Sequence, residues 1–244
     1  MFRRMSRLLV SFVMIMAGAV IGVGATSGTA HADECYTWSR TLSEGSSGGD
    51  VTQLQIRVAG WVTSGERLSY DGQFGARTTA AVKKFQAAYG LTADGVAGSQ
   101  TFSKIYALQD ADCTPVHFTY AELNRCNSDW SGGAVSAATA KANALKTMWK
   151  LEAMRHALGD VSVTVSSGFR SYACNNAVGG SSTSRHLYGD AADLTGSPTL
   201  CRLAQQARTH GFSEILGPGY PGHNDHTHVA LDPSPYWSAP TCGI

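Results

Sequence analysis

The residues whose types and spacing could carry chemistry lie in two short stretches of this 244-residue chain. The stretch SRHLYGDAADL places His186 seven residues before Asp193. The stretch HNDHTHV contains three histidines within six residues: His223, His226 and His228. A catalytic zinc ion usually takes three protein ligands from His, Asp or Glu and keeps one position open for water. The His-Glu-x-x-His helix of the commonest zinc proteases does not occur in the sequence.

The spacing within these stretches allows the groups to meet. His226 and His228 are two residues apart, so on a strand their side chains lie on the same face of a sheet. Asp193 on a neighbouring strand can point to that face, and Gly189 allows the loop after His186 to fold back toward it. A lone His-x-His is more often a strand with two polar outward positions. The combination of both stretches nevertheless predicts a metal site.

The first 32 residues have the pattern of a secretory signal. A segment with three arginines precedes an apolar run over residues 8–25, and Ala-His-Ala at residues 30–32 fits a cleavage site. An uncleaved membrane anchor is the alternative, because the apolar run approaches spanning length. Cleavage leaves 16 basic and 18 acidic side chains, a formal net charge of −2. This balance argues against a nucleic-acid partner, which requires a concentrated basic face.

All six cysteines follow this segment, and an even number in an exported chain indicates disulfide bonds. They are Cys35, Cys113, Cys126, Cys174, Cys201 and Cys242. The sequence contains no Cys-x-x-Cys pair, which argues against a structural zinc knuckle. Many pairings are possible, and we favour the sequential one because Cys35 and Cys113 bracket a segment with its own pattern.

Residues 33–113 are predicted to form a small domain of three helices. DGQFGART and DGVAGSQT share the frame D-G-x-x-G-x-x-T, in which a glycine turn leads into a helix with a hydroxyl residue at its start. Apolar residues recur at helical spacing around both repeats. The segments LSEGSSGGDVTQLQ, DGQFG, AVKKFQAAYGL and DGVAG resemble the peptidoglycan-binding domain of bacterial wall hydrolases. The resemblance implies a module that binds the wall polymer; a packing domain without a ligand is the alternative.

Residues 114–244 are predicted to form an α+β domain with an antiparallel sheet. A long helix is expected from near Ser136 to Gly159, with its charged residues mostly in solvent: Lys141, Lys146, Lys150 and Arg155. Alternating valines before SSGFRS predict a strand, and GDAADL and HTHVAL predict two more. A helix is expected over residues 200–210. This order of helices and strands favours the α+β class.

The second domain carries the motif S-x-H-x-x-G-x-A-x-D, followed by a late His-x-His. It is present as Ser184, His186, Gly189, Ala191 and Asp193. This pattern resembles the zinc D-Ala-D-Ala carboxypeptidase family, which shares its metal-site architecture with lysostaphin-type endopeptidases and the hedgehog signalling domain. With the wall-binding segment in front, the resemblance covers nearly all of residues 33–244.

The resemblance implies one Zn²⁺ per chain, held by His186, Asp193 and His228 with water in the fourth position. It further implies that Asp225 takes a proton from that water and later delivers one to the leaving amine. Related enzymes often have Glu at this position, so the shorter Asp225 departs from the family pattern.

Other residues are implied to bind substrate or stabilise charge. His226 would lie beside the metal and stabilise the developing oxyanion, and Arg170 would face the reacting carbonyl or the substrate carboxylate. Ser184 would orient the substrate or a ligand. Tyr220 and His223 are expected to line the cleft, although a loop packed on itself is an equal alternative.

The resemblance therefore implies a secreted, wall-associated enzyme that removes the terminal D-alanine from peptidoglycan stem peptides. One alternative is an endopeptidase that cuts peptide cross-bridges, because relatives with the same metal ligands do so. Another is a zinc-bearing wall-binding protein without turnover. We expect a monomer that has no membrane association once residues 1–32 are removed.

Overall fold

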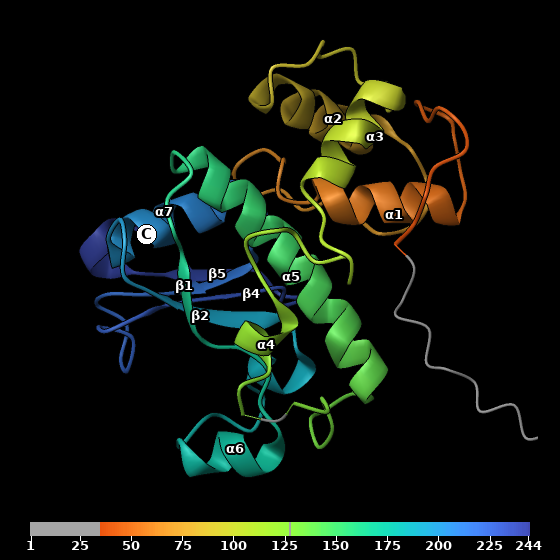
Figure 1. The fold of residues 1–244 in the computed structure, drawn as a ribbon. Coiled ribbons are helices and arrows are strands. Elements are labelled where there is room, and N and C mark those ends of the chain that lie inside the picture. Colours follow the sequence, from red (N-terminus) through yellow and green to blue (C-terminus); the bar gives the residue numbers. More distant parts are fainter. Residues whose placement is uncertain (1–34, 127) are drawn as a thin grey trace, which may run out of the picture. The chain divides into compact units, whose positions relative to one another are not determined.

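The computed structural model describes residues 35–126 and 128–244 (Figure 1). These residues belong to one compact unit, Ala32–Ile244. The predicted signal segment and its cleavage site, residues 1–32, lie outside the described residues. Within the described ranges, no helix combines the length and the apolar character that crossing a bilayer requires.

Three short helices form the N-terminal part, hereafter the bundle. They are α1 (Gly49–Val58), α2 (Ala76–Ala88) and α3 (Ser99–Ala107). Apolar side chains at helical spacing, such as Leu54, Phe85 and Ile105, are buried in their common core. The predicted helical domain is confirmed.

Each D-G-x-x-G-x-x-T frame leads into a helix as expected, but its threonine does not cap that helix. The side-chain nitrogen of Gln55 donates to Oδ1 of Asp71 at 2.9 Å and to Oγ1 of Thr78 at 3.3 Å. Its oxygen accepts from the backbone N–H of Gly72 at 3.0 Å, and Gln86 binds the second repeat in the same way. Helices α2 and α3 have no side-chain cap. The threonines therefore bind a glutamine of the preceding helix instead of capping their own.

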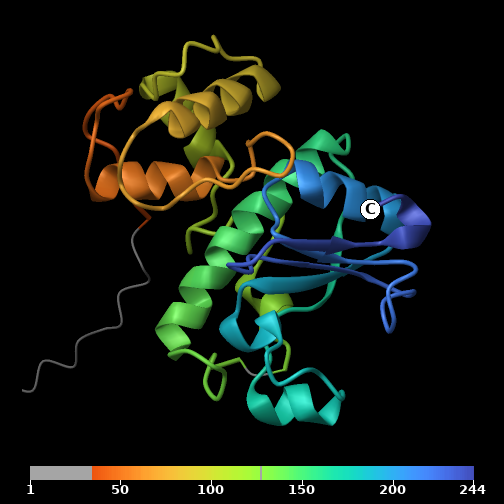
Figure 2. The same ribbon diagram turned by 180° about the vertical axis from the view of Figure 1, so that it is seen from behind.

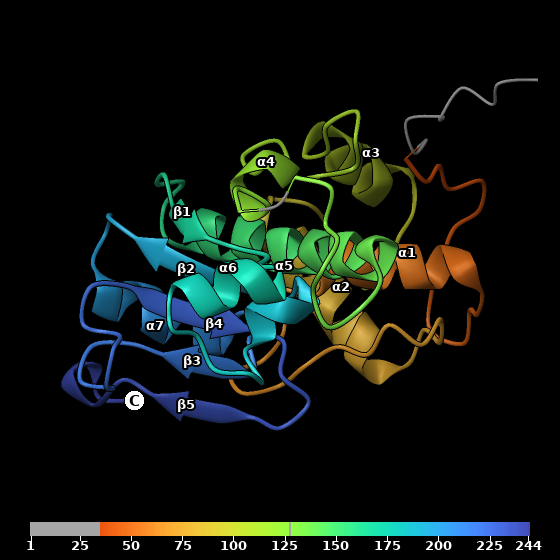
Figure 3. The same ribbon diagram turned by 90° about the horizontal axis from the view of Figure 1, so that it is seen from below.

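The C-terminal part, hereafter the sheet region, is a five-stranded sheet with helices around it. Its elements are α4 (Tyr120–Leu123), α5 (Ala137–Ala157), β1 (Thr164–Ser167), α6 (Tyr172–Ala177), η1 (Arg185–Tyr188), β2 (Ala191–Thr195), α7 (Leu200–Thr209), β3 (Glu214–Leu216), β4 (Thr227–Ala230), β5 (Tyr236–Ser238) and η2 (Pro240–Cys242). The strand order is β1-β2-β4-β3-β5, which Figure 3 shows across the sheet. The α+β class is confirmed; β5 pairs with β3 in parallel, whereas the other pairs are antiparallel as expected.

One face of this sheet is apolar and the other carries the polar residues of interest. Ala192, Leu194 and Val229 alternate onto the first face, where they join a core with side chains of α5 and α7 (Figures 1 and 2). Successive strand residues point to opposite faces. Asp193 and His228 therefore project from the second face, away from these helices.

Helix α5 confirms the long predicted helix, but two of its supposedly solvated residues are buried. Lys150 is 2% exposed, and its Nζ donates to the carbonyl oxygens of Gly211 at 2.8 Å and Ala59 at 3.4 Å. Arg155 is 7% exposed and pairs with Glu152 at 3.0 Å. The helix packs against the sheet region on one side and against α1 on the other. The sequence pattern of one helix did not reveal this second packing surface.

The three disulfide bonds follow the sequential pairing that we favoured: Cys35–Cys113, Cys126–Cys174 and Cys201–Cys242. The first closes the ends of the bundle segment. The second joins the segment before α5 to α6, and the third joins α7 to η2. The three bonds thus join segments that are 78, 48 and 41 residues apart in the sequence.

Candidate metal centre and active site

Two of the predicted ligands are brought together by strand register. In the antiparallel pair of β2 and β4, Asp193 lies directly opposite His228. Paired residues in register project from the same face of a sheet, with their Cβ atoms close together. Oδ1 of Asp193 and Nδ1 of His228 are 2.9 Å apart.

The third predicted ligand arrives from the short helix η1. Gly189 ends this helix in the left-handed conformation, with φ of 74°. A Cβ at this position would also clash with the backbone of Ala140, so only glycine fits the turn. The turn returns His186 to β2, where its Nε2 lies 3.0 Å from Oδ1 of Asp193 and 3.1 Å from Nδ1 of His228.

These three side chains fit a metal ion. They are buried, and their ligand atoms lie within 4.8 Å of one another. Ligand atoms around a tetrahedral zinc ion stand roughly 3.3 Å apart. Nδ1 of His186 donates to the carbonyl oxygen of Gly168 at 2.6 Å, and this bond turns Nε2 of the ring toward the Asp193 carboxylate. A metal ion at this place would bind the two imidazole nitrogens and the carboxylate oxygen together.

The electrostatics of Asp193 and His228 favour the forms that bind a cation. Burial raises the pKa of the Asp193 carboxyl, but His186 and His228 outweigh it and hold that pKa well below its usual range. Burial lowers the pKa of His228, against the opposing effect of Asp193. An ionised carboxylate and a neutral imidazole are the ligand forms that metals bind.

The three residues lie at one side of a cavity of about 500 Å³. Its lining comes from the loop after α6, from η1, from the strands and from the loop before β4: Arg170, Val178, Gly179, Gly180, Ser181, Ser184, Arg185, His186, Asp193, Glu214, Leu216, Pro221, Gly222, His223, His226 and His228. Of the residues predicted for the site, Asp225 and Tyr220 do not line this cavity.

Arg170 follows β1, whose pairing with β2 shifts register between Val165 and Ser167. Such an irregularity bends a strand and redirects the residues after it. The Nε of Arg170 donates to Oγ of Ser167 at 3.0 Å, and its Nη2 donates to Oδ2 of Asp193 at 2.6 Å. Arg170 thus occupies the carboxylate oxygen that does not face the histidines.

His226 and Asp225 lie at the rim, just before β4. Nε2 of His226 is 3.7 Å from Oδ1 of Asp193, and its Nδ1 is 2.8 Å from Oδ1 of Asp225. The Asp225 side chain is 89% exposed. The hydrogen bond with His226 lowers the pKa of Asp225. The structure therefore brings His226 to the metal site and connects Asp225 to it through the His226 ring.

The loop before β4 forms a wall of aromatic rings. The ring of His223 lies 4.7 Å from that of His226, and burial lowers the pKa of His223. Tyr220 contacts His223 at 5.2 Å and Tyr236 at 6.2 Å between ring centroids. Tyr220 therefore stands behind His223, as part of the loop's own packing.

Three groups near the ligands were not predicted from the sequence. Glu214 lines the cavity from β3, with Oε1 3.9 Å from Nε2 of His228. The hydroxyl of Ser167 and the carbonyl of Gly168 hold Arg170 and His186. The sequence did contain a signal for Glu214, since an acidic residue in the otherwise apolar short strand EIL is unusual. No side-chain pattern can signal a backbone carbonyl.

Comparisons with known proteins agree with both parts of the chain. Residues 116–230 match the family described as peptidase M15, and residues 47–105 match a peptidoglycan binding domain. A zinc D-Ala-D-Ala carboxypeptidase of Streptomyces albus G is 66% identical over 233 residues, which are 95% of this chain and 91% of that protein.

Two further matches cover shorter segments. An uncharacterized protein of Kitasatospora aureofaciens is 33% identical over 107 residues, or 41% of this chain and 86% of the relative. A crystal structure of a fused Zn-dependent amidase/peptidase/peptidoglycan-binding domain-containing protein of Clostridium acetobutylicum is 31% identical. It covers 27% of this chain and 28% of its own, with a TM-score of 0.24. Since the match to the Streptomyces protein extends over nearly the full length of both chains, the chain belongs to the peptidase M15 family.

Proposed function

We propose that this protein is a zinc-dependent carboxypeptidase that removes the terminal D-alanine from peptidoglycan stem peptides ending in D-Ala-D-Ala. The observation that carries the proposal is the convergence of His186, Asp193 and His228 in a polar cavity beside Arg170. The 66% identical relative is named a zinc D-Ala-D-Ala carboxypeptidase, which supports the substrate class.

The proposed metal ligands are Nε2 of His186, Oδ1 of Asp193 and Nδ1 of His228. Two imidazoles and one carboxylate are a donor set that suits zinc and leaves one position open. When bound, zinc polarises a peptide carbonyl and lowers the pKa of water toward about 7.

Asp225 is the proposed general base and acid. Its carboxylate has a lowered pKa and is ionised at neutral pH, so it can accept a proton from water at the rim of the cavity. The hydrogen bond with His226 orients Asp225. The same ring, whose Nε2 lies 3.7 Å from Oδ1 of Asp193, would stabilise the negative charge that develops on the carbonyl oxygen. Asp225 then delivers the proton to the leaving amine.

Arg170 and Ser184 are the proposed binding groups for the peptide end. A guanidinium binds a terminal carboxylate through parallel hydrogen bonds, and Ser167 and Asp193 fix the plane of Arg170. Ser184 also lines the cavity and directly precedes η1. His223 supplies the wall next to the rim, supported from behind by Tyr220.

The bundle is proposed to keep the enzyme on its substrate. Residues 33–113 would form the wall-binding domain and residues 114–244 the catalytic domain, with residues 1–32 removed on export. In this proposal the enzyme is a monomer that lies outside the membrane and is associated with the cell wall. The match of residues 47–105 to a peptidoglycan binding domain supports this arrangement.

Product analysis tests the proposal. Purified, zinc-loaded protein is incubated with a peptide ending in D-Ala-D-Ala and with muropeptides, and the products are identified by mass spectrometry. We expect release of single D-alanine residues, which stops on chelation and returns with zinc. Separation of cross-linked dimers without release of D-alanine would identify an endopeptidase, and zinc binding without any product would identify a binding protein. His186→Ala should abolish product formation, whereas His117→Ala, at an exposed histidine beside α5, should not.

A further inference from the structure

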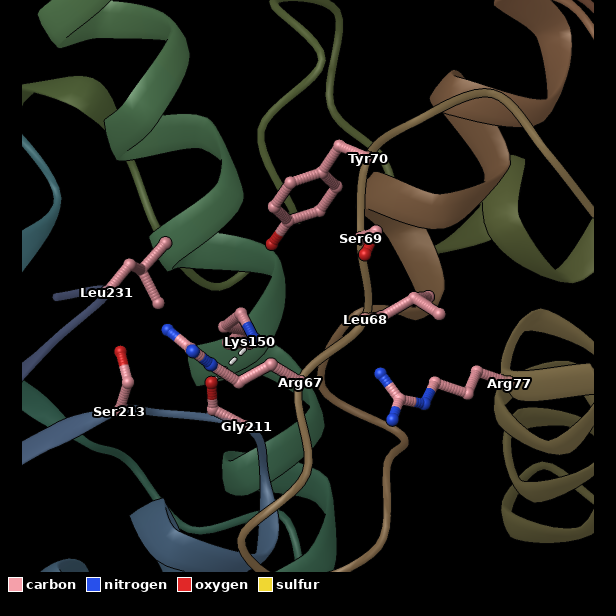
Figure 4. Close-up of a pocket in the computed structure, with 9 residues that line it drawn as sticks. All are labelled: Arg67, Leu68, Ser69, Tyr70, Arg77, Lys150, Gly211, Ser213 and Leu231. Carbon is pink, nitrogen blue, oxygen red and sulfur yellow. Dashed lines mark hydrogen bonds between the residues drawn. The ribbon is translucent and has the colours of Figure 1, made fainter. Parts of the chain in front are cut away.

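A second cavity lies outside the candidate active site, between the segment that precedes and begins α2 and the sheet region (Figure 4). Its volume is about 300 Å³. It is lined by Arg67, Leu68, Ser69, Tyr70, Arg77, Lys150, Gly211, Ser213 and Leu231. We call it the basic pocket.

The basic pocket has a one-sided charge. Three of its nine lining residues are cationic, namely Arg67, Arg77 and Lys150, and none is acidic. Within residues 35–126 and 128–244, none of the three forms an ion pair with a carboxylate. Arg67 instead donates through Nη1 to the carbonyl oxygens of Asp232 at 2.8 Å and Pro233 at 3.2 Å. Positive groups around one small volume repel one another unless an anion lies among them.

The amine of Lys150 has a fixed position beside the pocket. Gly211 has φ of +76°, and a Cβ there would come within 2.6 Å of the Lys150 Nζ. The amine donates hydrogen bonds to the carbonyl oxygens of Gly211 and Ala59, which hold it beside the cavity. Burial, together with a smaller effect of nearby Arg67, lowers the pKa of Lys150 to about 7. Such an amine gains a proton readily when an anion binds next to it.

Tyr70 supplies an independent sign of a ligand. Its hydroxyl is buried and has no hydrogen-bond partner among the described residues. Figure 4 shows this hydroxyl directed toward α5, with the guanidinium of Arg67 on the same side and that of Arg77 extending from α2. Buried hydroxyl groups are normally hydrogen-bonded, because an unsatisfied one costs stability. A ligand oxygen in the pocket would satisfy it.

We propose that the basic pocket binds one phosphate group. Two guanidinium groups, one ammonium and the hydroxyls of Tyr70 and Ser69 offer more donors than the two oxygens of a carboxylate can accept, whereas the oxygens of a phosphate can accept from most of them. The group can come from free phosphate or from the phosphodiester of an anionic polymer. The site is separate from the zinc ligands, so it does not depend on the proposed peptidase activity.

The test measures phosphate binding to the zinc-loaded protein by calorimetry and thermal unfolding. Inorganic phosphate is compared with chloride and acetate at equal ionic strength. A ligand of the folded state raises Tm, and at ten times its Kd we expect a rise of roughly 3–6 °C over chloride. No difference between phosphate and chloride, or an equal effect of acetate, would overturn the proposal.

Two variants assign the binding to this pocket, because phosphate also binds zinc. Arg77→Gln removes a cation that forms no ion pair in the described structure, and it should weaken phosphate binding at least tenfold. Lys83→Gln removes a cation from the same helix outside the pocket and should leave the Kd unchanged. Unchanged phosphate affinity in Arg77→Gln would contradict the proposal.

Tyr70→Phe provides a second test, because a loss of folding could not produce its expected Tm values. Without phosphate, this variant should be at least as stable as the parent, because it removes a hydroxyl without a partner. With phosphate, its rise in Tm should be smaller than that of the parent. An equal rise in both proteins counts against the site.

The source of the phosphate group is decided with a poly(glycerol phosphate) chain as a second probe. Binding of the chain that is stronger than that of inorganic phosphate, and weakened by Arg77→Gln, assigns the pocket to a polymer. Binding of inorganic phosphate alone assigns it to the free ion. Failure of both probes to bind overturns the proposal.

Discussion

The carbonyl oxygen of Gly168 accepts a hydrogen bond from Nδ1 of His186 at 2.6 Å. This bond joins the turn after β1 to helix η1. Because it keeps the proton on Nδ1, it directs Nε2 of His186 toward Asp193 and His228. The orientation of one proposed zinc ligand thus depends on the path of the main chain at Gly168.

Gly168→Ala should disturb that path. An added Cβ would clash with the backbone of Leu123, so the turn must move. We expect a loss of about 1–3 kcal/mol in the free energy of unfolding and zinc binding weakened by about 10–100-fold. Urea unfolding and competition with a chromophoric chelator measure the two effects. Gly49→Ala is the control, since its Cβ meets nothing within 4 Å. Parental zinc affinity in Gly168→Ala would show that the carbonyl does not orient the ligand.

Arg170 is expected to act through its geometry as well as its charge. Arg170→Lys keeps the charge but loses the planar pair of donors that hold Ser167 and Asp193. We expect kcat/KM for a D-Ala-D-Ala peptide to fall about 100-fold. Ser167→Ala removes only the bond that orients Nε and should have a smaller effect in the same direction. Arg202→Lys, on α7, is the matched control, and an Arg170→Lys enzyme as active as this control would refute the role.

A substitution of Asp225 can test proton transfer without disturbing zinc binding. Its side chain is 89% exposed and contacts none of the proposed ligands directly. Asp225→Asn should therefore lower kcat by about 100-fold or more while zinc content stays at one ion per chain. The free energy of unfolding should change by less than about 0.5 kcal/mol. Glu66→Gln, at an exposed acid in the bundle, serves as the control. Full activity of Asp225→Asn would mean that another group is the base.

Because of the buried His210, we expect the free energy of unfolding to depend on pH. Burial lowers its pKa from 6.5 to about 4, although its Nδ1 donates to the carbonyl of Gly60 at 2.7 Å. The unfolded chain binds the proton more readily between these values. The stabilising contribution is therefore complete above pH 6.5 and is lost as the pH falls toward 4. At pH 5 the loss should be about 2 kcal/mol.

The measurement compares the parent with His210→Gln at pH 7.5 and pH 5, at one fixed zinc concentration so that loss of zinc affects both proteins. The parent should lose more free energy of unfolding between these pH values than the variant. Parallel losses in the two proteins would assign the acid sensitivity to other groups.

The elements of the fold were largely predictable because their apolar patterns are local. Helical spacing around Leu54 and Phe85 predicted the bundle, and alternation of apolar residues predicted the strands that carry Asp193 and His228. The burial of Lys150 was not predictable, because it depends on a second surface from α1 that lies far away in the sequence. The parallel pairing of β5 had no sequence signal for the same reason.

The candidate site likewise has some features that could be predicted from the sequence and others that could not. The pleat places His226 and His228 toward one side, and Gly189 explains the return of His186, so residue types and spacing predicted a metal site, whereas the particular ligand set was implied by the resemblance. The positions of Asp225 and Tyr220 outside the cavity depend on the path of a glycine- and proline-rich loop, which spacing does not determine. The basic pocket assembles Arg67, Arg77 and Lys150 from separate segments, and only the tertiary structure brings them together.

The proposed activity depends on one zinc ion held by His186, Asp193 and His228. Anomalous diffraction at the zinc edge, from crystals of the purified protein, tests it most directly. We predict a single strong peak about 2.0–2.2 Å from His186 Nε2, Asp193 Oδ1 and His228 Nδ1. A peak elsewhere, or an active protein with no zinc peak between these atoms, would contradict the account.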